Sequence, residues 1–307
     1  MIFSQFTYFD VNTFNTSLKK YTSVKKLGIN FKVFGFSRDD LMRMDPEVLR
    51  GIIHERTHHT IEVLIYRILN GKMKIPENFG EVVRFLLDIW KSRGLPMDAP
   101  DMKWAQQYLD LALKLRRGEK IELDTELPKP FSEEEMRVVE KLLYGRRSIR
   151  QWKPKPVPEE LIRKILYAGL MAPQGCNLGT TRFLILRTPE EKKLVRSDIP
   201  VDNAVIIVVC QDMRIYRALK YDELVPQNIF YDAAAAADHM CLIAHALGLG
   251  AVWLTHGKES TERLRKHFNL PDYIETRLHI AIGWPDEAPI KSQRMNLDEV
   301  IIGKYRG

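Results

Sequence analysis

Several short segments of the chain combine residue types that could bind an anionic ligand. The first is Arg146-Arg147-Ser148-Ile149-Arg150, in which three guanidinium groups and a hydroxyl lie within one short run. Arginine donates paired, planar hydrogen bonds that match the oxygens of a phosphate. A basic run is also common on a solvated surface. The segment alone therefore leaves both a phosphate site and a charged face open.

A second segment, residues 172–177, combines a proline, a glycine and two amide side chains. Gly175 permits close approach of the backbone to a ligand. The amides of Gln174 and Asn177 can each donate and accept hydrogen bonds. The same residues are typical of a simple turn between a helix and a strand, so this segment also has two interpretations.

Two further segments lie nearer the C-terminus. In residues 248–257, Gly248 and Gly250 end a predicted helix, and a short predicted strand follows that leads into a polar turn at Thr255 and His256. The spacing is not the G-x-G-x-x-G of dinucleotide-binding proteins, and the glycines follow a helix rather than a strand. The last segment, residues 291–294, ends in Arg294 and precedes an acidic and apolar stretch.

A competing pattern lies in the first half of the chain. His54, Glu55 and His58 fit H-E-x-x-H, which on a helix could bind zinc with the glutamate as general base. Such a site needs a third ligand and an open coordination position, and Glu77 and Glu81 are candidates for that ligand. The alternative is that these are structural histidines on a half-buried helix. A metal-dependent hydrolase is thus one hypothesis, although no metal ligand is assigned.

The elements that must position these residues differ between the two halves of the chain. Residues 1–126 are predicted to form a mostly helical domain. Ser37 and the Asp45-Pro46 pair are typical helix starts. Apolar residues recur with helical spacing after position 60. The predicted helices of this domain span residues 38–44, 46–69, 79–92 and 101–117.

Residues 121–131 contain two prolines and no periodicity, which predicts a boundary before a second domain, residues 127–307. There, Ser132 and Glu135 form a capping box. Helices are predicted over residues 133–144, 158–170, 231–250 and 259–268, with a short one after Thr188-Pro189. Strands are predicted over residues 181–187, 204–210, 251–255 and 277–283, with 299–302 as a further candidate. Helices layered on a mixed sheet indicate an α+β fold.

In this order and spacing, the RRSIR, APQGCN, GLGAVWLTHG and QR segments resemble the nitroreductase family over residues 131–307. The resemblance implies a nitroreductase-like mixed sheet flanked by helices. It also implies a homodimer with FMN at the subunit interfaces, NAD(P)H as electron donor, and a nitro compound or quinone as acceptor. Flavin N5 would carry the chemistry, so no catalytic side chain is expected. Close packing by the alanines at 233–237 could occur within a subunit or across the dimer axis.

The resemblance also assigns cofactor contacts to individual residues. The phosphate and ribityl groups would be bound by Arg146, Arg147, Ser148, Arg150 and Arg294. The loop along the flavin ring would comprise Gln174, Gly175 and Asn177. The turn at Thr255 and His256 would present a backbone N–H to flavin N5. The His256 side chain could contact substrate or pack internally.

Two features depart from the family pattern or add to it. The usual lid between residues 190 and 204 is missing, so we expect either residues 211–230 or the N-terminal domain to cover the flavin. Arg56, His59 and Glu62 resemble an R-x-x-H-x-x-E pattern in a helical extension found in some members. That likeness implies an internal ion-pair cluster rather than a zinc site.

The composition of the chain bears on its partners and its location in the cell. The chain has 47 Lys and Arg against 40 Asp and Glu, a net charge of +7 that is spread along both halves and forms no patch for nucleic acid. The three cysteines form no C-x-x-C pair and are odd in number, which favours a location in the reducing cytoplasm. Residues 1–14 do not resemble a signal peptide, and no membrane span is expected. A flavin-binding protein without turnover is the remaining alternative to an oxidoreductase or a hydrolase.

Overall fold

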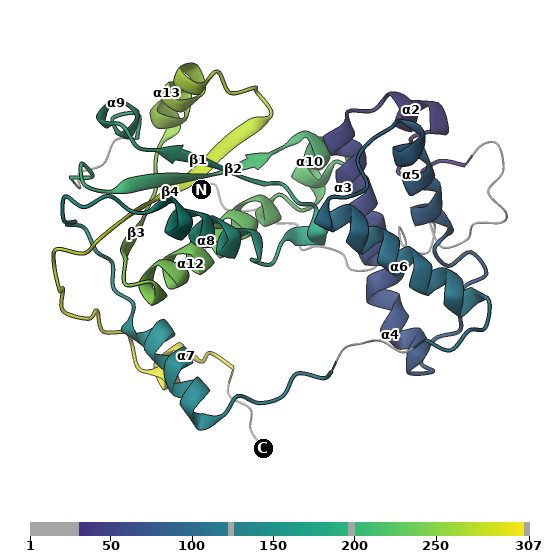
Figure 1. Cartoon of the computed structure of the whole chain (residues 1–307), viewed down its shortest axis with the longest axis horizontal. Helices are drawn as coiled ribbons and strands as arrows, with labels where there is room; N and C mark the ends of the chain where they lie inside the picture. Colours follow the sequence, from purple (N-terminus) through teal and green to yellow (C-terminus); the bar gives the residue numbers. More distant parts are fainter. Residues whose placement is uncertain (1–30, 122–125, 196–199, 304–307) are drawn as a thin grey trace.

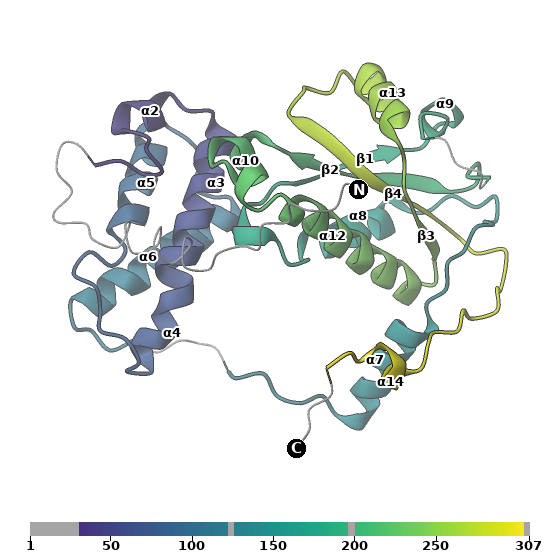
Figure 2. The same cartoon turned by 180° about the vertical axis from the view of Figure 1, so that it is seen from behind.

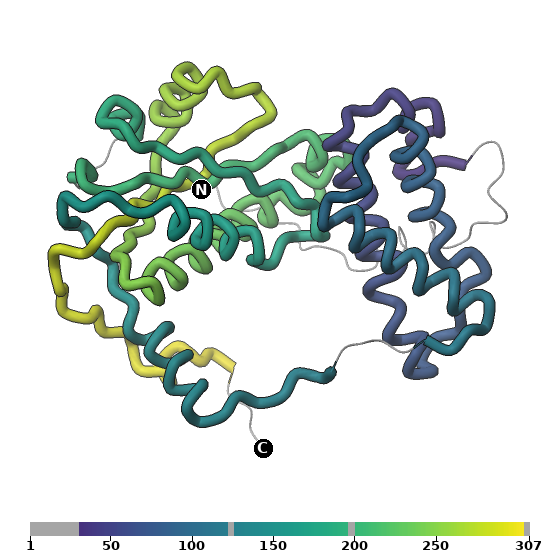
Figure 3. The backbone as a smooth tube through the Cα atoms, viewed as in Figure 1, coloured from purple at the N-terminus to yellow at the C-terminus, as the bar shows by residue number. Residues whose placement is uncertain are grey.

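A computed structural model of the protein describes residues 31–121, 126–195 and 200–303. The expectation about a signal peptide falls on residues 1–30, outside this part of the chain. A group of N-terminal helices lies beside a layered unit built on a sheet (Figure 1; Figure 3). A helix pair formed by α7 (Glu133–Gly145) and α14 (Leu297–Val300) extends from the layered unit (Figure 2).

The sheet has four described strands in the order β1-β2-β4-β3, and each neighbouring pair is antiparallel. This arrangement with its flanking helices confirms the predicted α+β fold. Its only described parallel element is an isolated bridge between Ser148 and Ala251. The strands are β1 (Thr181–Leu186), β2 (Val205–Asp212), β3 (Gly250–Leu254) and β4 (Ile274–Gly283).

Apolar side chains cover both faces of the sheet. Alternate residues of a strand point to opposite faces, so in β2 Ile207 and Val209 join one core while Ile206 and Val208 join another. One core is covered by α8 and α12, and the other contains Leu264 of α13. The helices of this unit are α8 (Glu159–Leu170), α9 (Pro189–Lys192), α12 (Gln227–Ala246) and α13 (Lys258–Phe268).

The alanine-rich part of α12 packs inside the subunit. Ala233, Ala236 and Ala237 are buried in the core that α8 also contributes to. Gly169 of α8 lies so close to Met240 that an added Cβ would be 2.8 Å from the sulfur. Small residues therefore allow α8 and α12 to approach closely. Of the two alternatives for residues 233–237, packing within a subunit or across a dimer axis, the structure shows the first.

The predicted N-terminal helices are present, with one irregularity. A π-helical turn, His58–Glu62, divides the predicted helix at 46–69 into α3 (Pro46–Thr57) and α4 (Val63–Leu69). Asp45 caps α3 by accepting from the backbone of Glu47. The other helices are α2 (Arg38–Arg43), α5 (Glu81–Ser92) and α6 (Pro100–Arg116). Within the described ranges no helix combines the length and apolarity that crossing a membrane requires.

The N-terminal helices share an apolar core with the layered unit. Two short helices follow β2, namely α10 (Arg214–Ala218) and α11 (Tyr221–Leu224). Ile215 and Tyr216 of α10 and Tyr221 of α11 lie in the same buried cluster as Ile52 of α3. Gly51 lets α3 approach α10, because a Cβ there would lie 2.6 Å from Ile215 Cγ1. Residues 211–230, which were one candidate for covering the flavin, thus contribute side chains to the core of the N-terminal helices, the other candidate.

Helices α7 (Glu133–Gly145) and α14 (Leu297–Val300) lie beside each other, as both views show (Figure 1; Figure 2). The candidate strand at 299–302 is wrong. The Asn296 side chain and Glu299 form a capping box that starts a helix there, and no described strand pairs with this segment. None of the residues of α7 is buried within the subunit.

The close approach of α3 and α10 gives a stability prediction. We expect Gly51→Val to lower the free energy of unfolding by about 1–3 kcal/mol, since the added side chain overlaps Ile215 and overpacks the shared core. Chemical denaturation measures the change. Gly303→Val is the control, because a Cβ at 303 meets no heavy atom within 4 Å. Equal stability of the two variants would contradict tight packing at Gly51.

Candidate functional site

The RRSIR segment is held against the edge of the sheet by its apolar neighbours. Ile149 is buried, and its backbone N–H donates to Ala251 O at 3.1 Å. Trp152 is also buried and donates from Nε1 to Gly250 O at 3.0 Å. A Cβ on Gly250 would lie 2.6 Å from Ile149, so glycine is needed for this contact. The segment therefore has a fixed place beside β3.

A cavity of about 320 Å³ brings the first and last predicted segments together. Its wall combines five cationic side chains with two serines and no carboxylate. The polar lining residues are Arg146, Arg147, Ser148, Arg150, Lys291, Ser292 and Arg294. Residues that are far apart in sequence thus form one positively charged surface, which suits a phosphate group.

The 174–177 loop is positioned by a buried carboxylate. Gly175 donates its backbone N–H to Asp232 Oδ1 at 2.8 Å, and the Tyr216 hydroxyl donates to Asp232 Oδ2 at 2.8 Å. Burial raises the pKa of Asp232, while these two hydrogen bonds act in the opposite direction. Cys176 and Asn177 have positive φ angles of 54° and 52°. The loop is therefore a defined structure and more than a simple turn.

Sequence reasoning missed the role of Asp232. The available signal was an acidic residue at the start of an otherwise apolar, alanine-rich helix. A buried carboxylate in such a place needs hydrogen-bond partners, but the sequence does not say which. The structure supplies them from α10 and from the loop.

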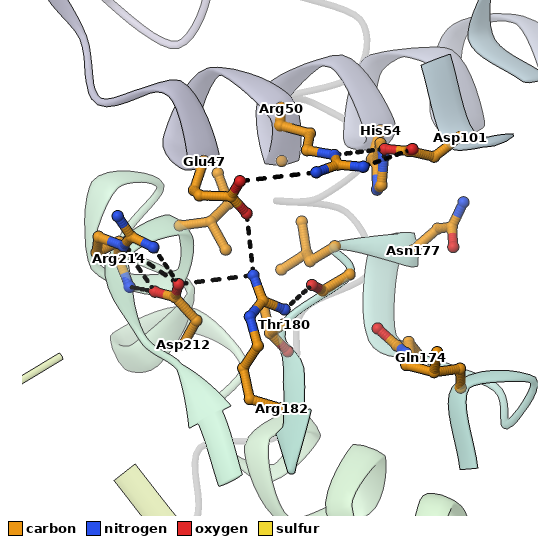
Figure 4. A pocket seen from close by; sticks show the side chains of 15 residues that line it. Glu47, Arg50, His54, Asp101, Gln174, Asn177, Thr180, Arg182, Asp212 and Arg214 are labelled. Carbon is orange, nitrogen blue, oxygen red and sulfur yellow. Dashed lines mark hydrogen bonds and ion pairs between the residues drawn. The ribbon is translucent and has the colours of Figure 1, made fainter. Parts of the chain in front are cut away.

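Gln174 and Asn177 line a second cavity of about 600 Å³, between the loop and the N-terminal helices (Figure 4). Helices α3 and α6 contribute Arg50, His54 and Asp101 to its wall. The side-chain oxygen of Gln174 is buried without a hydrogen-bond partner among the described residues. Within one subunit, seven of the ten predicted cofactor contacts are thus divided between two cavities that share no lining residue, whereas Gly175, Thr255 and His256 line neither of the two.

Thr255 and His256 follow the end of β3. The His256 side chain points into the protein, with its Nδ1 3.2 Å from His279 Nδ1 and its Nε2 2.9 Å from Thr276 Oγ1. Of the two alternatives for this side chain, the structure favours internal packing. Burial lowers the pKa of His256, and burial together with His256 lowers that of His279 to about 4.

The H-E-x-x-H residues separate into different interactions. His54 Nε2 donates to Asp101 Oδ2 at 2.7 Å, whereas His58 Nδ1 lies 2.7 Å from Glu62 Oε2. Glu55 is buried in an ion pair with its neighbour Arg56. This arrangement uses the glutamate internally and gives the hydrolase hypothesis no support. Across the described ranges, no group of three or more His, Cys, Asp or Glu side chains could hold a metal.

Glu55 is the centre of the internal cluster that the R-x-x-H-x-x-E likeness implied. Arg56 pairs with it, His59 Nδ1 lies 3.0 Å from Glu55 Oε1, and the Tyr221 hydroxyl donates to Glu55 at 3.1 Å. Burial raises the pKa of Glu55, but Arg56 and His59 outweigh it and lower the value to about 2. Glu62, the residue named from the pattern, pairs with His58 instead.

Comparison with known proteins relates the second half of the chain to one family. The Nitroreductase family profile matches residues 143–203 and 190–284. A Methanothermobacter thermautotrophicus protein, named as a candidate NADH dehydrogenase/NAD(P)H nitroreductase, is 30% identical over 167 residues, which cover 52% of this chain and 84% of that protein. An NADH dehydrogenase of Thermus thermophilus is 28% identical over 189 residues, covering 51% of this chain and 91% of that protein.

Among solved structures, one similar chain is a candidate nitroreductase from Desulfovibrio desulfuricans in complex with FMN. It is 31% identical, with a TM-score of 0.43, over 59% of this chain and 99% of that chain.

The class of enzyme that these similarities define is the flavin-dependent oxidoreductases. The chain belongs to the nitroreductase family, as its resemblance over residues 131–307 implied.

The buried histidine pair gives a pH prediction. The folded-state pKa of His279, about 4, is below its ordinary value of 6.5. Its contribution to stability is therefore complete above pH 6.5 and is lost as the pH falls toward 4, by up to ~1.4 kcal/mol per pH unit. We expect urea denaturation of His279→Gln to show a weaker loss of stability over this range than wild type. Identical slopes would contradict the prediction.

Proposed function

We propose that the protein is an FMN-dependent oxidoreductase that takes electrons from NAD(P)H and passes them to an organic acceptor such as a nitro compound or a quinone. The observation that carries this proposal is the cationic cavity formed by residues 146–150 and 291–294. Arg146 and Arg294 would hold the cofactor by its phosphate, and the bound flavin would supply the hydride and electron transfer between donor and acceptor. The protein's part is to bind the cofactor, orient it and exclude water.

The donor set fits FMN at both ends. A phosphate carries about two negative charges, and the guanidiniums of Arg146 and Arg294 line one cavity that contains no carboxylate. At the other end, the buried Gln174 oxygen needs an N–H donor. The pyrimidine edge of a flavin offers such a donor. The loop between Gln174 and Asn177 is fixed by Gly175, which donates its N–H to Asp232 and packs so closely on Asn228 that a Cβ there would lie 2.5 Å from Asn228 Nδ2.

A homodimer would join the two halves of this site. Because one subunit divides the predicted contacts between two cavities, we infer that FMN binds between the phosphate cavity of one subunit and the 174–177 loop of another. Exposed apolar residues on and near α7 and α14 support this, together with an apolar groove of about 1030 Å³ between α8 and α12. Those exposed residues include Met136, Val138, Leu143, Tyr144, Met295, Leu297, Val300 and Ile302.

A cytoplasmic location is also part of the proposal. It rests on the three cysteines, Cys176, Cys210 and Cys241, all of which are free thiols in the structure. A reducing compartment keeps thiols in this state.

The direct test is the cofactor itself. We expect the purified protein to be yellow, to release FMN on denaturation, and to lose its flavin absorbance when NADH or NADPH is added without oxygen. Addition of a quinone or a nitroaromatic compound should restore the absorbance. Protein that releases another flavin would contradict the FMN assignment. Protein that holds FMN but is reduced by neither nicotinamide would favour a binding protein without turnover.

The phosphate contacts give a quantitative prediction. We expect Arg146→Ala and Arg294→Ala each to weaken FMN binding about 10- to 100-fold, because each removes a charged hydrogen bond worth about 1.5–3 kcal/mol. Fluorescence titration of the apoprotein with FMN measures the dissociation constant. Arg67→Ala is the matched control, since Arg67 is exposed on α4 in the N-terminal helices. Unchanged FMN affinity in the double arginine variant would contradict the assignment.

The assembly gives a separate prediction. We expect a stable dimer by analytical ultracentrifugation, with more than about 2,000 Å² buried between subunits. Val138→Asp on α7 should shift the protein toward monomer and reduce FMN retention. Val63→Asp on α4 places the same change on another exposed valine and should leave the dimer intact. A wild-type monomer that retains FMN would refute the interface site.

A further inference from the structure

The 600 Å³ cavity has walls from two parts of the chain that are distant in sequence. One wall is the loop and strand that begin at Gln174, and the other is formed by α3 and α6 of the N-terminal helices. Figure 4 shows Arg50 and His54 across the cavity from Asn177 and Gln174. The volume is in the range of ordinary small-molecule sites.

The carboxylates of this cavity are already paired with arginine side chains, and Asp101 also accepts a hydrogen bond from a histidine. Asp101 accepts from Arg50 Nε and Nη2 at 2.6 Å each and from His54 Nε2 at 2.7 Å. Burial raises the pKa of Asp101, but the hydrogen bonds from Arg50 and His54 outweigh it and hold the pKa well below its usual range. Asp101 is therefore an ionised anchor whose two oxygens have strong partners, and it offers little to a cationic ligand.

The other two carboxylates are engaged in the same way. Glu47 accepts from Arg182 Nη2 at 3.0 Å, and Asp212 is bound by Arg214 and lies 3.6 Å from Arg182. Together these groups form a chain of alternating charges across the boundary between the N-terminal helices and the sheet (Figure 4). Glu47 and Asp212 each contact two arginines, and Asp101 contacts Arg50 and His54.

Arg50 has donors left over. Its Nε and Nη2 bind Asp101, whereas Nη1 has Glu47 as its salt-bridge partner at 3.6 Å, beyond the usual hydrogen-bond length. The guanidinium is half-exposed and pre-oriented by a bidentate contact. His54 stabilises the same arrangement from α3, and its ring packs edge-on against Trp104 at 5.9 Å. The surplus of donors favours a ligand with an anionic group.

The remaining lining residues add an apolar surface. Leu170, Leu178 and Ile215 line the same cavity as Arg50. They can contact a hydrocarbon ring while the guanidinium binds an acidic substituent. A small aromatic acid matches both parts of the wall in polarity.

We propose that this cavity binds the electron acceptor, that the acceptor is a small aromatic molecule with a carboxylate, and that Arg50 binds that carboxylate. Asp101 and His54 are positioning residues that fix the guanidinium. The inference rests on the proposed function, because Gln174 and Asn177 line the same cavity and belong to the loop assigned to the flavin ring. The N-terminal helices thereby select the substrate.

The test compares a matched pair of probes that differ in charge. Calorimetric titration of the FMN-loaded protein with benzoate and with benzamide avoids turnover, since neither probe is reduced. We expect wild type to bind benzoate at least about tenfold more tightly than benzamide, a typical effect of one charged hydrogen bond. Arg50→Gln should bring the ratio close to one. Arg84→Gln removes a similarly paired arginine from α5 and should leave the ratio unchanged.

Steady-state kinetics supply the second readout. With 4-nitrobenzoate, Arg50→Gln should raise KM about tenfold or more with little change in kcat, while 4-nitrobenzamide should show little effect on either constant. Arg50→Lys keeps the charge but loses the bidentate contact with Asp101, so it should give an intermediate benzoate preference. If Arg50→Gln does not fold, the benzoate preference of Arg50→Lys serves as the test instead.

The outcomes separate the two hypotheses. No benzoate preference in wild type, or a preference that survives in Arg50→Gln or is undiminished in Arg50→Lys, would overturn the inference while leaving reduction of neutral acceptors intact. Absence of FMN, or of any reduction by NAD(P)H, would instead overturn the proposed function. In that case, the same titration of the protein as purified would still support an acid-binding cavity if it showed a benzoate preference that depends on Arg50.

Discussion

The packing of α3 against α10 is the contact on which the rest of the structure depends. It brings Gly51 and Ile215 together and merges the N-terminal helices with the sheet unit in one apolar core. Without it, the 600 Å³ cavity would have only one wall. The ion pairs that cross the same boundary, such as Glu47 with Arg182 and Asp45 with Arg214, are partly exposed and add less. Burial of apolar surface thus holds the parts together, and the charges determine the chemistry of the space between them.

A second constraint comes from the division of the cofactor contacts. Cationic groups gather at the end of α7 and before α14, whereas the amide-bearing loop lies beside the N-terminal helices. The proposed site between two subunits would resolve this division, and it would give a role to the apolar residues of α7, none of which is buried in the subunit. The same symmetry would place each N-terminal unit beside the flavin of a shared site. Cofactor binding, assembly and substrate selection are therefore coupled in the proposed enzyme.

The sequence allowed prediction of the features that depend on local order. Runs of apolar and other strand-forming residues predicted the strands, and helical spacing and capping boxes predicted most helices. Four short segments in order predicted the family. The candidate strand at 299–302 was wrong because a capping box at Asn296 places its first two residues in a helix, and no described strand pairs with Ile301 and Ile302, which follow that helix. The contact of His54 with Asp101 joins residues 47 positions apart, and Asp232 binds a loop and a tyrosine on separate elements. No pattern of spacing specifies such long-range partners.

The hydrogen bonds of Asp232 have a consequence for how the chain can be divided or recombined. Tyr216 donates to Asp232 and is also buried in the core of the N-terminal helices, while Asp232 fixes Gly175 in the loop. The N-terminal region is therefore not a module that can be exchanged by cutting in the proline-containing segment before Ser132. A chimaera that takes these helices from a relative must also take that relative's α10, α11 and the start of α12. Amino-acid changes in these separate stretches are expected to have accumulated together during evolution.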